Sequence, residues 1–460
     1  MSNKVSTKPP SGTRDFLPLD IARRQYVIDV IREVYERHGF VPLETPAIEN
    51  LSTLLGKYGD EGDQLLYRLL HRRDALKRAV QTAATDGRPV AEAELADQGL
   101  RYDLTVPLAR VMAQYGQLPR FFRRYQIQPV WRADRPARGR FREFYQCDVD
   151  VAGTTSPVAE VEVCSAVAAV LERLGFADFT IRLNHRELLR ALIRAADITD
   201  SLESKALVAV DKLDKIGRDG VTAELVDRGI AETSAARLIE LITPGDPGDA
   251  SPDSQTVLAH LRKCGLDESG QRALAGLEEL LSLAAETPAG SHLSVAPELA
   301  RGLSYYTGPI FEIAVPDLAG SLGGGGRYDG LIGMFGRRQI PAVGFSLGLE
   351  RILVVMQERD MYPELGVGAE VMLCWLDVDM GRALGVAARL RGQGLRVETF
   401  PDQAKLGKQL QYADTTGASI AAILGQSELD AGRITLKHLA KRTQESVAID
   451  EAAEAVARMR

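Results

Sequence analysis

Cysteine is scarce in this chain of 460 residues, and no two cysteines stand at a CxxC or other metal-ligand spacing. The four are Cys147, Cys164, Cys264 and Cys374. This pattern indicates inert thiols in a reducing compartment. The chain has no apolar run long enough to span a bilayer. Residues 1–14 are polar and lack the apolar core of a signal peptide. We therefore expect a cytoplasmic protein without a membrane partner.

The chain also has no excess of positive charge. Its 56 lysines and arginines stand against 63 aspartates and glutamates, which gives a net charge of −7. Bulk electrostatics therefore neither supports nor excludes a nucleic-acid partner, and such a contact would need a local basic patch. Hydrophobic residues at 45% and charged residues at 26% are typical of a globular chain. A chain of this length predicts roughly two to four domains.

The first part of the chain shows helical and strand-like patterns in turn. Apolar residues recur at helical spacing over residues 19–38 and predict an amphipathic helix that stops at Gly39. The helix leads into the strand-like residues 40–44 and is long enough to pack against a partner subunit. We expect residues 60–99 to form an irregular insertion, because their helix formers end in a glycine-proline break. Residues 120–151 contain two runs rich in β-branched and aromatic residues, which predict an antiparallel hairpin with a long arginine-bearing loop.

The second part of the chain contains a helical stretch and a separate C-terminal pattern. Helix formers dominate residues 187–283, so we expect a helical insertion there. Strand signals return at 310–315, and a strand leading into a helix is predicted at 343–356. Beyond a break at 363–368, strand-like and helical segments alternate as far as residue 424. This alternation predicts a small α/β domain with a mostly parallel sheet.

The densest group of cations lies in the predicted hairpin. It consists of Arg120, Arg123, Arg124, Arg132, Arg135, Arg138, Arg140 and Arg142, with only Asp134 opposing them in that span. Guanidinium groups bind phosphate oxygens bidentately, so the group suits a nucleoside triphosphate or the end of an RNA. The alternative is a solvated hairpin surface that binds nothing.

Glycine is concentrated in residues 323–330, Gly-Gly-Gly-Gly-Arg-Tyr-Asp-Gly. Glycine has no Cβ and reaches positive φ, so such a run lets the backbone approach a ligand closely. The run lacks the lysine and Ser/Thr of a P-loop and the spacing of a dinucleotide fingerprint. Taken alone, such a run is more often merely a turn.

Further polar candidates stand in strand-like contexts. Asp103 is one, and alternation along the second hairpin strand places Gln146, Asp148 and Asp150 on one face. Polar groups buried on that face would require partners, and a cationic ligand would supply one. The alternative is an outward-facing polar row. The segment Arg301–Gly308 puts a cation and two phenols together before a strand, although tyrosines also commonly complete a core.

These segments together resemble the histidyl-tRNA synthetase family of class II aminoacyl-tRNA synthetases, and the resemblance runs over nearly the whole chain. Three segments resemble the class II motifs: Glu44-Thr45-Pro46 for motif 1, Val130–Val151 for motif 2 and Gly344–Arg351 for motif 3. Two resemble signatures special to histidine enzymes: Arg301–Gly308 and the Gly-Arg-Tyr-Asp-Gly element that ends at Gly330. Motif 3 alone would indicate only class II.

The resemblance implies a histidine-binding set and an ATP-binding set. Histidine would be bound at its α-amino group by Asp103, Thr105 and Gln146, and at its imidazole by Asp150 and Tyr306 with Tyr305 beside them. ATP would be bound by Arg132 at the α-phosphate and Arg351 at the γ-phosphate, and Arg132 and Arg301 would be catalytic. These roles suit the chemistry, since the histidine carboxylate attacks the α-phosphorus in line while fixed cations and Mg²⁺ neutralise the phosphate oxygens. No side-chain nucleophile is required.

The implied fold is α+β: an antiparallel class II synthetase sheet with helices, a helical insertion, and a C-terminal α/β anticodon-binding domain. We expect the catalytic core in residues 1–185 and 293–365, the insertion in 186–292, and the anticodon-binding domain in 369–460. The expected partners are L-histidine, ATP with Mg²⁺, tRNA(His) and a second copy in a homodimer. The alternatives are a non-catalytic regulator, such as the regulatory subunit of ATP phosphoribosyltransferase, or an RNA-binding adaptor. The three arginines of the ATP and catalytic sets argue against both.

Overall fold

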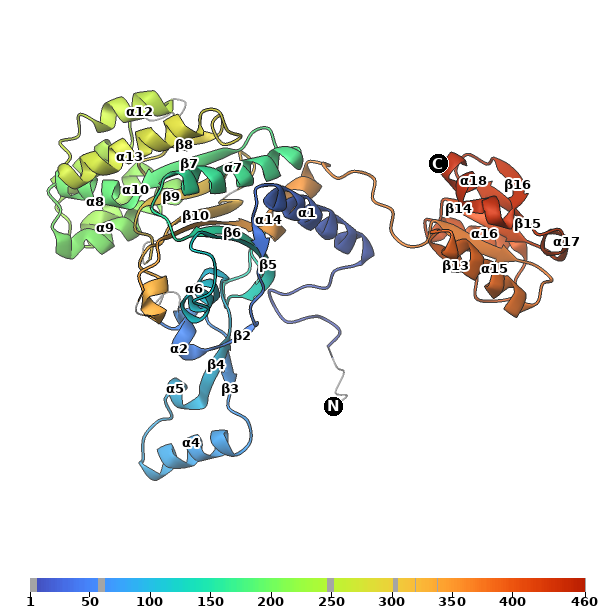
Figure 1. The fold of residues 1–460 in the computed structure, drawn as a ribbon. Helices are drawn as coiled ribbons and strands as arrows, with labels where there is room; N and C mark the ends of the chain where they lie inside the picture. Colours follow the sequence, from blue (N-terminus) through green and yellow to red (C-terminus); the bar gives the residue numbers. More distant parts are fainter. Residues whose placement is uncertain are drawn as a thin grey trace. The chain divides into compact units, whose positions relative to one another are not determined.

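The computed structural model describes residues 6–56, 63–245, 252–300, 305–318, 320–336 and 338–459, which form two compact units (Figure 1). The first unit contains Arg24–Met361 with the residues up to Asp15, and the second contains Tyr362–Arg460 with Phe16–Arg23. The helix predicted for residues 19–38 is confirmed as α1 (Pro18–Arg37).

The first unit is built on an eight-stranded sheet with the order β1-β5-β6-β11-β10-β9-β7-β8. Neighbouring strands are antiparallel, except that β1 pairs with β5 and β7 pairs with β8 in parallel. The strands are β1 (Val41–Pro42), β5 (Phe122–Trp131), β6 (Glu143–Ala152), β7 (Thr180–His185), β8 (Leu293–Val295), β9 (Pro309–Ala314), β10 (Gly323–Arg327) and β11 (Ala342–Gly348). The hairpin predicted for residues 120–151 is confirmed by β5 and β6. Two helices with buried apolar faces, α7 (Val158–Arg173) and α14 (Leu349–Glu358), pack against the central strands β6 and β11.

Helices fill the chain between β7 and β8, which confirms the helical pattern predicted for residues 187–283. They are α8 (Arg186–Ala195), α9 (Glu203–Val210), α10 (Leu213–Asp227), α11 (Glu232–Ile242), α12 (Ser254–Leu261) and α13 (Glu268–Ala284). Gly217, inside α10, has a φ of 71° and kinks the helix. A residue with a Cβ would be strained there, which explains why glycine stands at the kink.

The expectation of an irregular insertion at residues 60–99 is wrong for the described part of that stretch. β3 (Arg68–Leu70) and β2 (Ile48–Asn50) both pair with β4 (Ala96–Leu100) in a separate three-stranded sheet. Two helices, α4 (Asp74–Thr85) and α5 (Glu92–Leu95), lie between β3 and β4, and together these elements project from the large sheet (Figure 1). We call residues 66–100 the arm. Strands of three to five residues carry little alternating pattern, so the sequence did not reveal their pairing.

The second unit is a five-stranded sheet with helices. Its strands, in the order β13-β12-β14-β15-β16, are β13 (Val397–Thr399), β12 (Val371–Trp375), β14 (Ile420–Leu424), β15 (Arg433–His438) and β16 (Gln444–Ala448). Its helices are α15 (Met380–Gly392), α16 (Leu406–Thr415), α17 (Gln426–Asp430) and α18 (Ala452–Met459). The predicted α/β alternation is confirmed, but the sheet is mixed rather than mostly parallel, because β15 and β16 are antiparallel. Both strands lie beyond residue 424, where the predicted alternation stopped.

None of the described helices is long and apolar enough to cross a membrane. All four cysteines are buried free thiols, and burial raises the pKa of each one. A thiol with a raised pKa stays protonated and is a poor nucleophile. Burial of all four thiols fits the prediction that they are inert, which stays a prediction.

Candidate active site

A cavity of about 470 Å³ lies over the central strands of the eight-stranded sheet, in the first unit. Its walls come from β6, β9, β10 and β11, from the loop between β5 and β6, and from the start of α14. Eight of the residues proposed from the sequence line it: Asp103, Thr105, Arg132, Gln146, Asp150, Tyr305, Tyr306 and Arg351. The ninth, Arg301, lies outside the described residues.

Strand alternation places the polar side chains of β6 in the cavity. Gln146, Asp148 and Asp150 line it and are nearly fully buried, whereas Cys147 and Val149 between them are buried on the opposite face of the sheet. The alternative of an outward-facing polar row is therefore wrong. The register continues the polar face across the sheet, since Asp148 lies opposite Gln126 of β5 and Ser346 of β11.

Asp150 forms an ion pair with the buried side chain of Arg124. An Nη2 atom of Arg124 lies 2.8 Å from one carboxylate oxygen of Asp150, and the Tyr328 hydroxyl donates a hydrogen bond to the other. Arg124 has no exposed surface. Burial raises the pKa of Asp150, and the guanidinium charge of Arg124 opposes that rise. Oδ1 of Asp150 thus accepts a hydrogen bond, whereas Oδ2 contacts the Arg124 charge but accepts no hydrogen bond from a described residue.

Asp148 is less well satisfied. Its nearest cation is again Arg124, at 3.7 Å, and its Oδ1 atom has no hydrogen-bond partner among the described residues. Burial raises the pKa of Asp148 to about 7, in spite of Arg124. A buried carboxylate oxygen without a donor is costly, and a ligand N–H group would remove that cost. Asp148 was not among the residues assigned to histidine, although the alternation pattern already placed it on the same face.

Gln146 and Arg132 contact each other in the cavity wall. Gln146 donates to the Ser346 hydroxyl over 2.7 Å, and its oxygen is 3.5 Å from Arg132 Nη2. The Nε of Arg132 donates to the Tyr102 carbonyl oxygen over 2.8 Å, and its guanidinium carbon lies 5.1 Å from the ring centroid of Phe144. These contacts fix the guanidinium plane while leaving other N–H groups for a ligand.

The N-terminal turn of α14 contributes two charged residues. Arg351 donates from Nη1 to the Ser321 carbonyl oxygen. Glu350 accepts a hydrogen bond from the Tyr145 backbone N–H at 3.0 Å, and its other oxygen has no hydrogen-bond partner within the described part of the chain. Burial raises the pKa of Glu350 to about 7. Apart from its place beside Arg351, Glu350 carries no separate signal in the sequence.

The two tyrosines of the Arg301–Gly308 segment both pack and line the cavity. The ring centroids of Tyr305 and Tyr306 are 4.3 Å apart, and that of Tyr305 is 6.2 Å from Tyr328. Both pack against a cluster of buried apolar residues between the sheet and α6 (Thr105–Gln114). Burial raises the pKa of Tyr306, so its hydroxyl is a neutral donor. Core packing and ligand contact are therefore compatible at these positions.

Most of the glycine run forms a strand, so its explanation as a turn is wrong for Gly323–Gly326 and holds for Asp329 and Gly330 at its end. Gly323–Gly326 lie in β10, and none of the four has a positive φ. These positions require glycine because there is no space for a Cβ. A Cβ on Gly325, for example, would lie 2.2 Å from the Gly344 carbonyl oxygen. Gly344 of β11 has a similar role, because a Cβ there would lie 1.9 Å from Asp150 Oδ1. These glycines leave the space that the carboxylate and a bound ligand need.

The arginines of the hairpin lie in different places in the structure. The prediction that they form one common phosphate site is therefore corrected. Arg132 and Arg140 line the cavity, whereas Arg124 is buried beneath it. Arg123 and Arg138 form ion pairs with Glu162 and Glu358. The others are Arg120, Arg135 and Arg142, and the cavity lining does not include them. Arg120 and Arg135 are exposed, so the alternative of a solvated surface holds for these two. Arg142 is half-buried and donates hydrogen bonds to the carbonyl oxygens of Asp134 and Ser11.

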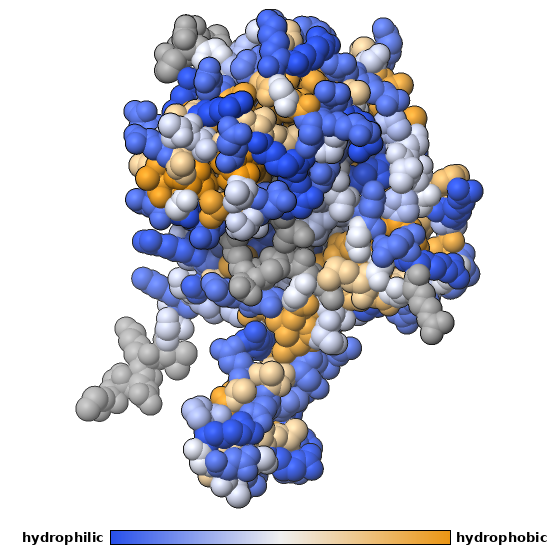
Figure 2. Space-filling model, turned by 90° about the vertical axis from the view of Figure 1, so that its left-hand side faces the viewer, coloured by the Kyte–Doolittle hydropathy of each residue, from blue (hydrophilic) through white to orange (hydrophobic). Residues whose placement is uncertain are grey.

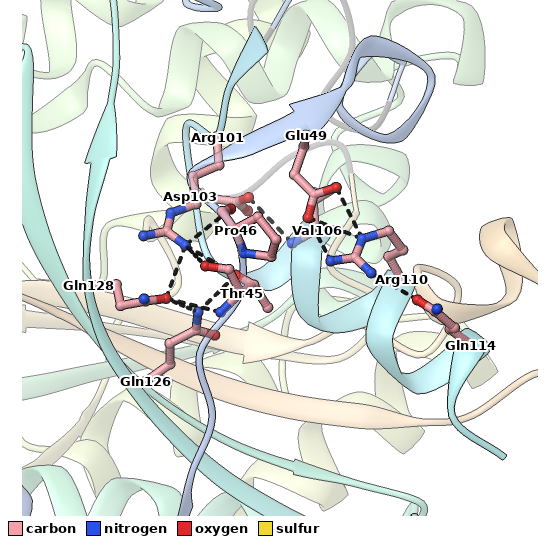
Figure 3. A network of polar contacts seen from close by, with 10 residues as sticks. All are labelled: Thr45, Pro46, Glu49, Arg101, Asp103, Val106, Arg110, Gln114, Gln126 and Gln128. Atoms are coloured by element: carbon pink, nitrogen blue, oxygen red, sulfur yellow. Dashed lines mark hydrogen bonds and ion pairs between the residues drawn. The ribbon is translucent and has the colours of Figure 1, made fainter. Parts of the chain in front are cut away.

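A buried network fixes the segment that carries Asp103 (Figure 3). Arg101 donates from Nη1 to the Thr45 carbonyl oxygen at 2.6 Å and to Gln128 Oε1 at 2.9 Å. Asp103 in turn accepts from the Val106 backbone N–H at 3.3 Å, at the start of α6. The motif 1-like segment, β5 and the strand-to-helix turn before α6 are thereby tied together. Arg101 is a positioning residue that the sequence did not single out.

Comparison with known proteins gives the same family along the whole chain. The histidyl-tRNA synthetase family model matches residues 90–352, and an anticodon binding domain model matches residues 371–459. The histidine–tRNA ligase of Porphyromonas gingivalis is 42% identical over 450 residues, which cover 96% of this chain and 97% of that protein. The histidine–tRNA ligase of Cytophaga hutchinsonii is 40% identical over 448 residues, with coverage of 96% and 97%.

Comparison with solved structures gives the same family. The crystal structure of histidyl-tRNA synthetase from Nostoc sp. PCC 7120 superimposes with a TM-score of 0.78 at 29% identity, covering 99% of this chain and 100% of that one. An ATP phosphoribosyltransferase regulatory subunit/histidyl-tRNA synthetase from Bacillus halodurans, at 22% identity and a TM-score of 0.73, shares the fold. With its catalytic sheet, its C-terminal α/β unit and relatives matched from end to end, the chain belongs to the histidyl-tRNA synthetase family of class II aminoacyl-tRNA synthetases.

Proposed function

We propose that the cavity residues described above carry out the histidine–tRNA ligase activity of this chain, which uses ATP to activate histidine before its transfer to tRNA(His). The single observation that supports this assignment is the polarity of one cavity. Buried carboxylates occupy its floor, and Arg132 and Arg351 lie on its wall. A cationic or N–H-rich amino acid and a polyphosphate can therefore lie side by side in it.

The carboxylate end accommodates histidine. We assign the α-amino group to Asp103, Thr105 and Gln146, and the imidazole to Asp150, Tyr305 and Tyr306. To this set we add Asp148, because its Oδ1 is a buried acceptor that no described residue satisfies. An amino acid without a ring N–H donor would leave this carboxylate unpaired, which is the physical basis of discrimination.

The arginine end accommodates ATP. We assign Arg132 to the α-phosphate, Arg351 to the γ-phosphate and Arg301 to the developing charge at the α-phosphorus. The described residues contain no group of three or more potential metal-ligating side chains. Mg²⁺ keeps several waters and binds one or two carboxylates together with phosphate oxygens. Glu350, whose second oxygen is buried without a hydrogen-bond partner among the described residues, is the protein ligand we propose, and the ion would neutralise phosphate charge there.

The remaining assignments follow from the family. We propose a homodimer that works in the cytoplasm, a catalytic core in residues 1–185 and 293–365, an insertion in 186–292 and an anticodon-binding domain in 369–460. Deletion of residues 369–460 should leave histidine activation measurable and impair charging of tRNA. Equal charging by the full-length and the truncated protein, both shown to be folded, would contradict the anticodon-binding role.

Exchange of labelled pyrophosphate into ATP, measured with each of the twenty amino acids, tests the function. We expect histidine alone to support exchange. Histidinol should compete with histidine, since it keeps the amino group and the ring but lacks the reacting carboxylate. Exchange with proline or threonine in place of histidine, or with none of the twenty, would overturn the proposal.

A further inference from the structure

The arm carries a group of exposed cations at the start of α4. The group consists of Arg72, Arg73, Lys77 and Arg78, which we call the arm cations. All four are exposed, and none forms an ion pair with another residue of the described chain. The protein has a net charge of −7, so this group is a local positive patch on a chain that is negative as a whole.

The acidic residues of the arm do not neutralise these cations. Glu92 pairs with Arg68, and Glu94 pairs with Arg88 at 2.8 Å. Asp86 also lies within 3.4 Å of Arg88. Most of the arm's negative charge is thus matched by other cations, and Asp74 is the one acid that stands in sequence among the arm cations. The start of α4 therefore keeps a net positive charge.

The orientation of α4 directs this charge outward. Ala83 is buried, and Leu76 and Ala79 are half-buried, so this side of the helix faces the rest of the arm. Arg73, just before the helix, and Lys77, in its first turn, are both exposed. Figure 2 shows mainly hydrophilic side chains on the outer part of the arm. Cations near the N-terminal end of a helix oppose its dipole, so they do not serve the stability of α4 itself.

The base of the arm lies at the rim of the cavity. Leu65, just before the arm, lines the cavity, and its carbonyl oxygen accepts a hydrogen bond from the backbone N–H of Ala133, beside Arg132. At the other end of the arm, β4 leads directly into Arg101 and Asp103. A polynucleotide whose end reaches the cavity would therefore pass close to the arm.

We propose that the arm cations bind the phosphate backbone of the tRNA whose 3′ end enters the cavity. The inference rests on the proposed function, which requires that end to reach activated histidine. Lysine and arginine without protein partners are the residues that neutralise backbone phosphates. The cores of protein–protein interfaces are instead poor in lysine, so a protein partner fits this surface less well.

The test compares wild type with a variant carrying Arg72→Ala, Arg73→Ala, Lys77→Ala and Arg78→Ala. Binding of tRNA(His) is followed by fluorescence titration over a series of salt concentrations, together with charging kinetics. Each lost phosphate contact removes about 0.7–0.9 from the slope of log affinity against log salt, so a loss of roughly 3 is expected. Histidine-dependent pyrophosphate exchange without tRNA should stay unchanged, because no arm cation lines the cavity.

Two control variants separate charge from other effects. Gln81→Ala with Thr85→Ala removes exposed polar groups of the same helix and should change neither slope nor exchange. Replacing the three arginines by lysine keeps the charge and should keep most of the slope. Proper folding of α4 in every variant is checked by resistance of the arm to limited proteolysis.

An unaltered salt slope in the four-alanine variant would overturn the proposal. A change in its sedimentation coefficient, with the slope unaltered, would assign the surface to a second copy of the chain and would also overturn it. Failure of the wild type to catalyse histidine-dependent exchange would instead contradict the proposed function. The fluorescence titration with tRNA(His) would still decide whether the arm binds tRNA. A slope reduced by roughly 3 with exchange intact would establish the arm as a tRNA contact.

Discussion

Arg124 of β5 lies directly opposite Asp150 of β6, and its guanidinium nitrogen is 2.8 Å from the carboxylate that forms part of the cavity floor. The same guanidinium is 3.7 Å from Asp148. One buried cation thus serves two buried carboxylates, and this arrangement leaves the floor with a net negative charge when both are ionised. Both the stability and the ligand preference of the site depend on this balance.

Arg124→Leu should destabilise the first unit. Removing one partner of a buried ion pair leaves an uncompensated charge, which costs about 3–5 kcal/mol of unfolding free energy. Urea unfolding, followed by tryptophan fluorescence and circular dichroism, measures the effect. Arg138→Ala, which removes an exposed arginine of the same hairpin, is the matched control and should have little effect. Equal stability of the two variants would contradict the structural role of Arg124.

Asp148→Asn should weaken histidine binding. A hydrogen bond to a charged acceptor contributes about 1.5–3 kcal/mol, so KM for histidine should rise about 10- to 100-fold while KM for ATP changes little. Pyrophosphate exchange measures both constants. Asp134→Asn removes a carboxylate that also lines the cavity but lies on the hairpin loop, and it should leave KM for histidine unchanged. A wild-type KM in Asp148→Asn would remove this residue from the histidine set.

The stability of the ligand-free protein should fall as pH rises towards 7. Burial raises the pKa of Asp148 from 3.8 to about 7, so the folded state retains a proton that the unfolded state has already released. Stability is therefore greatest below the unfolded pKa and is lost progressively as pH rises through the folded pKa. Thermal unfolding of wild type and Asp148→Asn across this range measures the difference. The variant should show a flatter profile, and parallel profiles would contradict the proton on Asp148.

Gly344→Ala should disturb the histidine end of the cavity. The added Cβ would lie 1.9 Å from Asp150 Oδ1, so the carboxylate would have to move away from Arg124 and Tyr328. We expect KM for histidine to rise at least about tenfold, the loss of one good polar contact. Gly330→Ala is the control, because no atom of the described chain other than those of Gly330 and its two chain neighbours lies within 4 Å of the added Cβ. Normal kinetics in Gly344→Ala would show that the floor tolerates displacement of Asp150.

Arg301→Ala should slow activation far more than it weakens ATP binding. A contact made mainly in the transition state acts on the chemical step, and loss of one such donor costs on the order of 10²–10³ in rate. Single-turnover formation of the adenylate, measured by rapid quench at saturating ATP and histidine, gives the rate constant. Arg301→Lys should recover part of the rate, and an unchanged rate constant in Arg301→Ala would exclude a catalytic role.

The sequence by itself determined the elements with strong local patterns. The helix at residues 19–38, the hairpin around its arginine loop and the helices of residues 187–283 each carry a regular apolar or propensity signal. Alternation along β6 was enough to predict that Gln146, Asp148 and Asp150 share one face of the sheet. Motif resemblance led to the family, which the full-length relatives confirm.

Only the tertiary structure decided what those residues do to one another. Arg124, Arg132 and Arg138 look alike in sequence, yet one is buried under a carboxylate, one lines the cavity and one pairs with Glu358. The direction of each side chain depends on strand register, and its partners come from segments far away in the chain. The same holds for the arm, whose short strands are defined by pairing between distant segments rather than by local pattern. Long-range pairing carries no local signature, so it is visible only once the chain is folded.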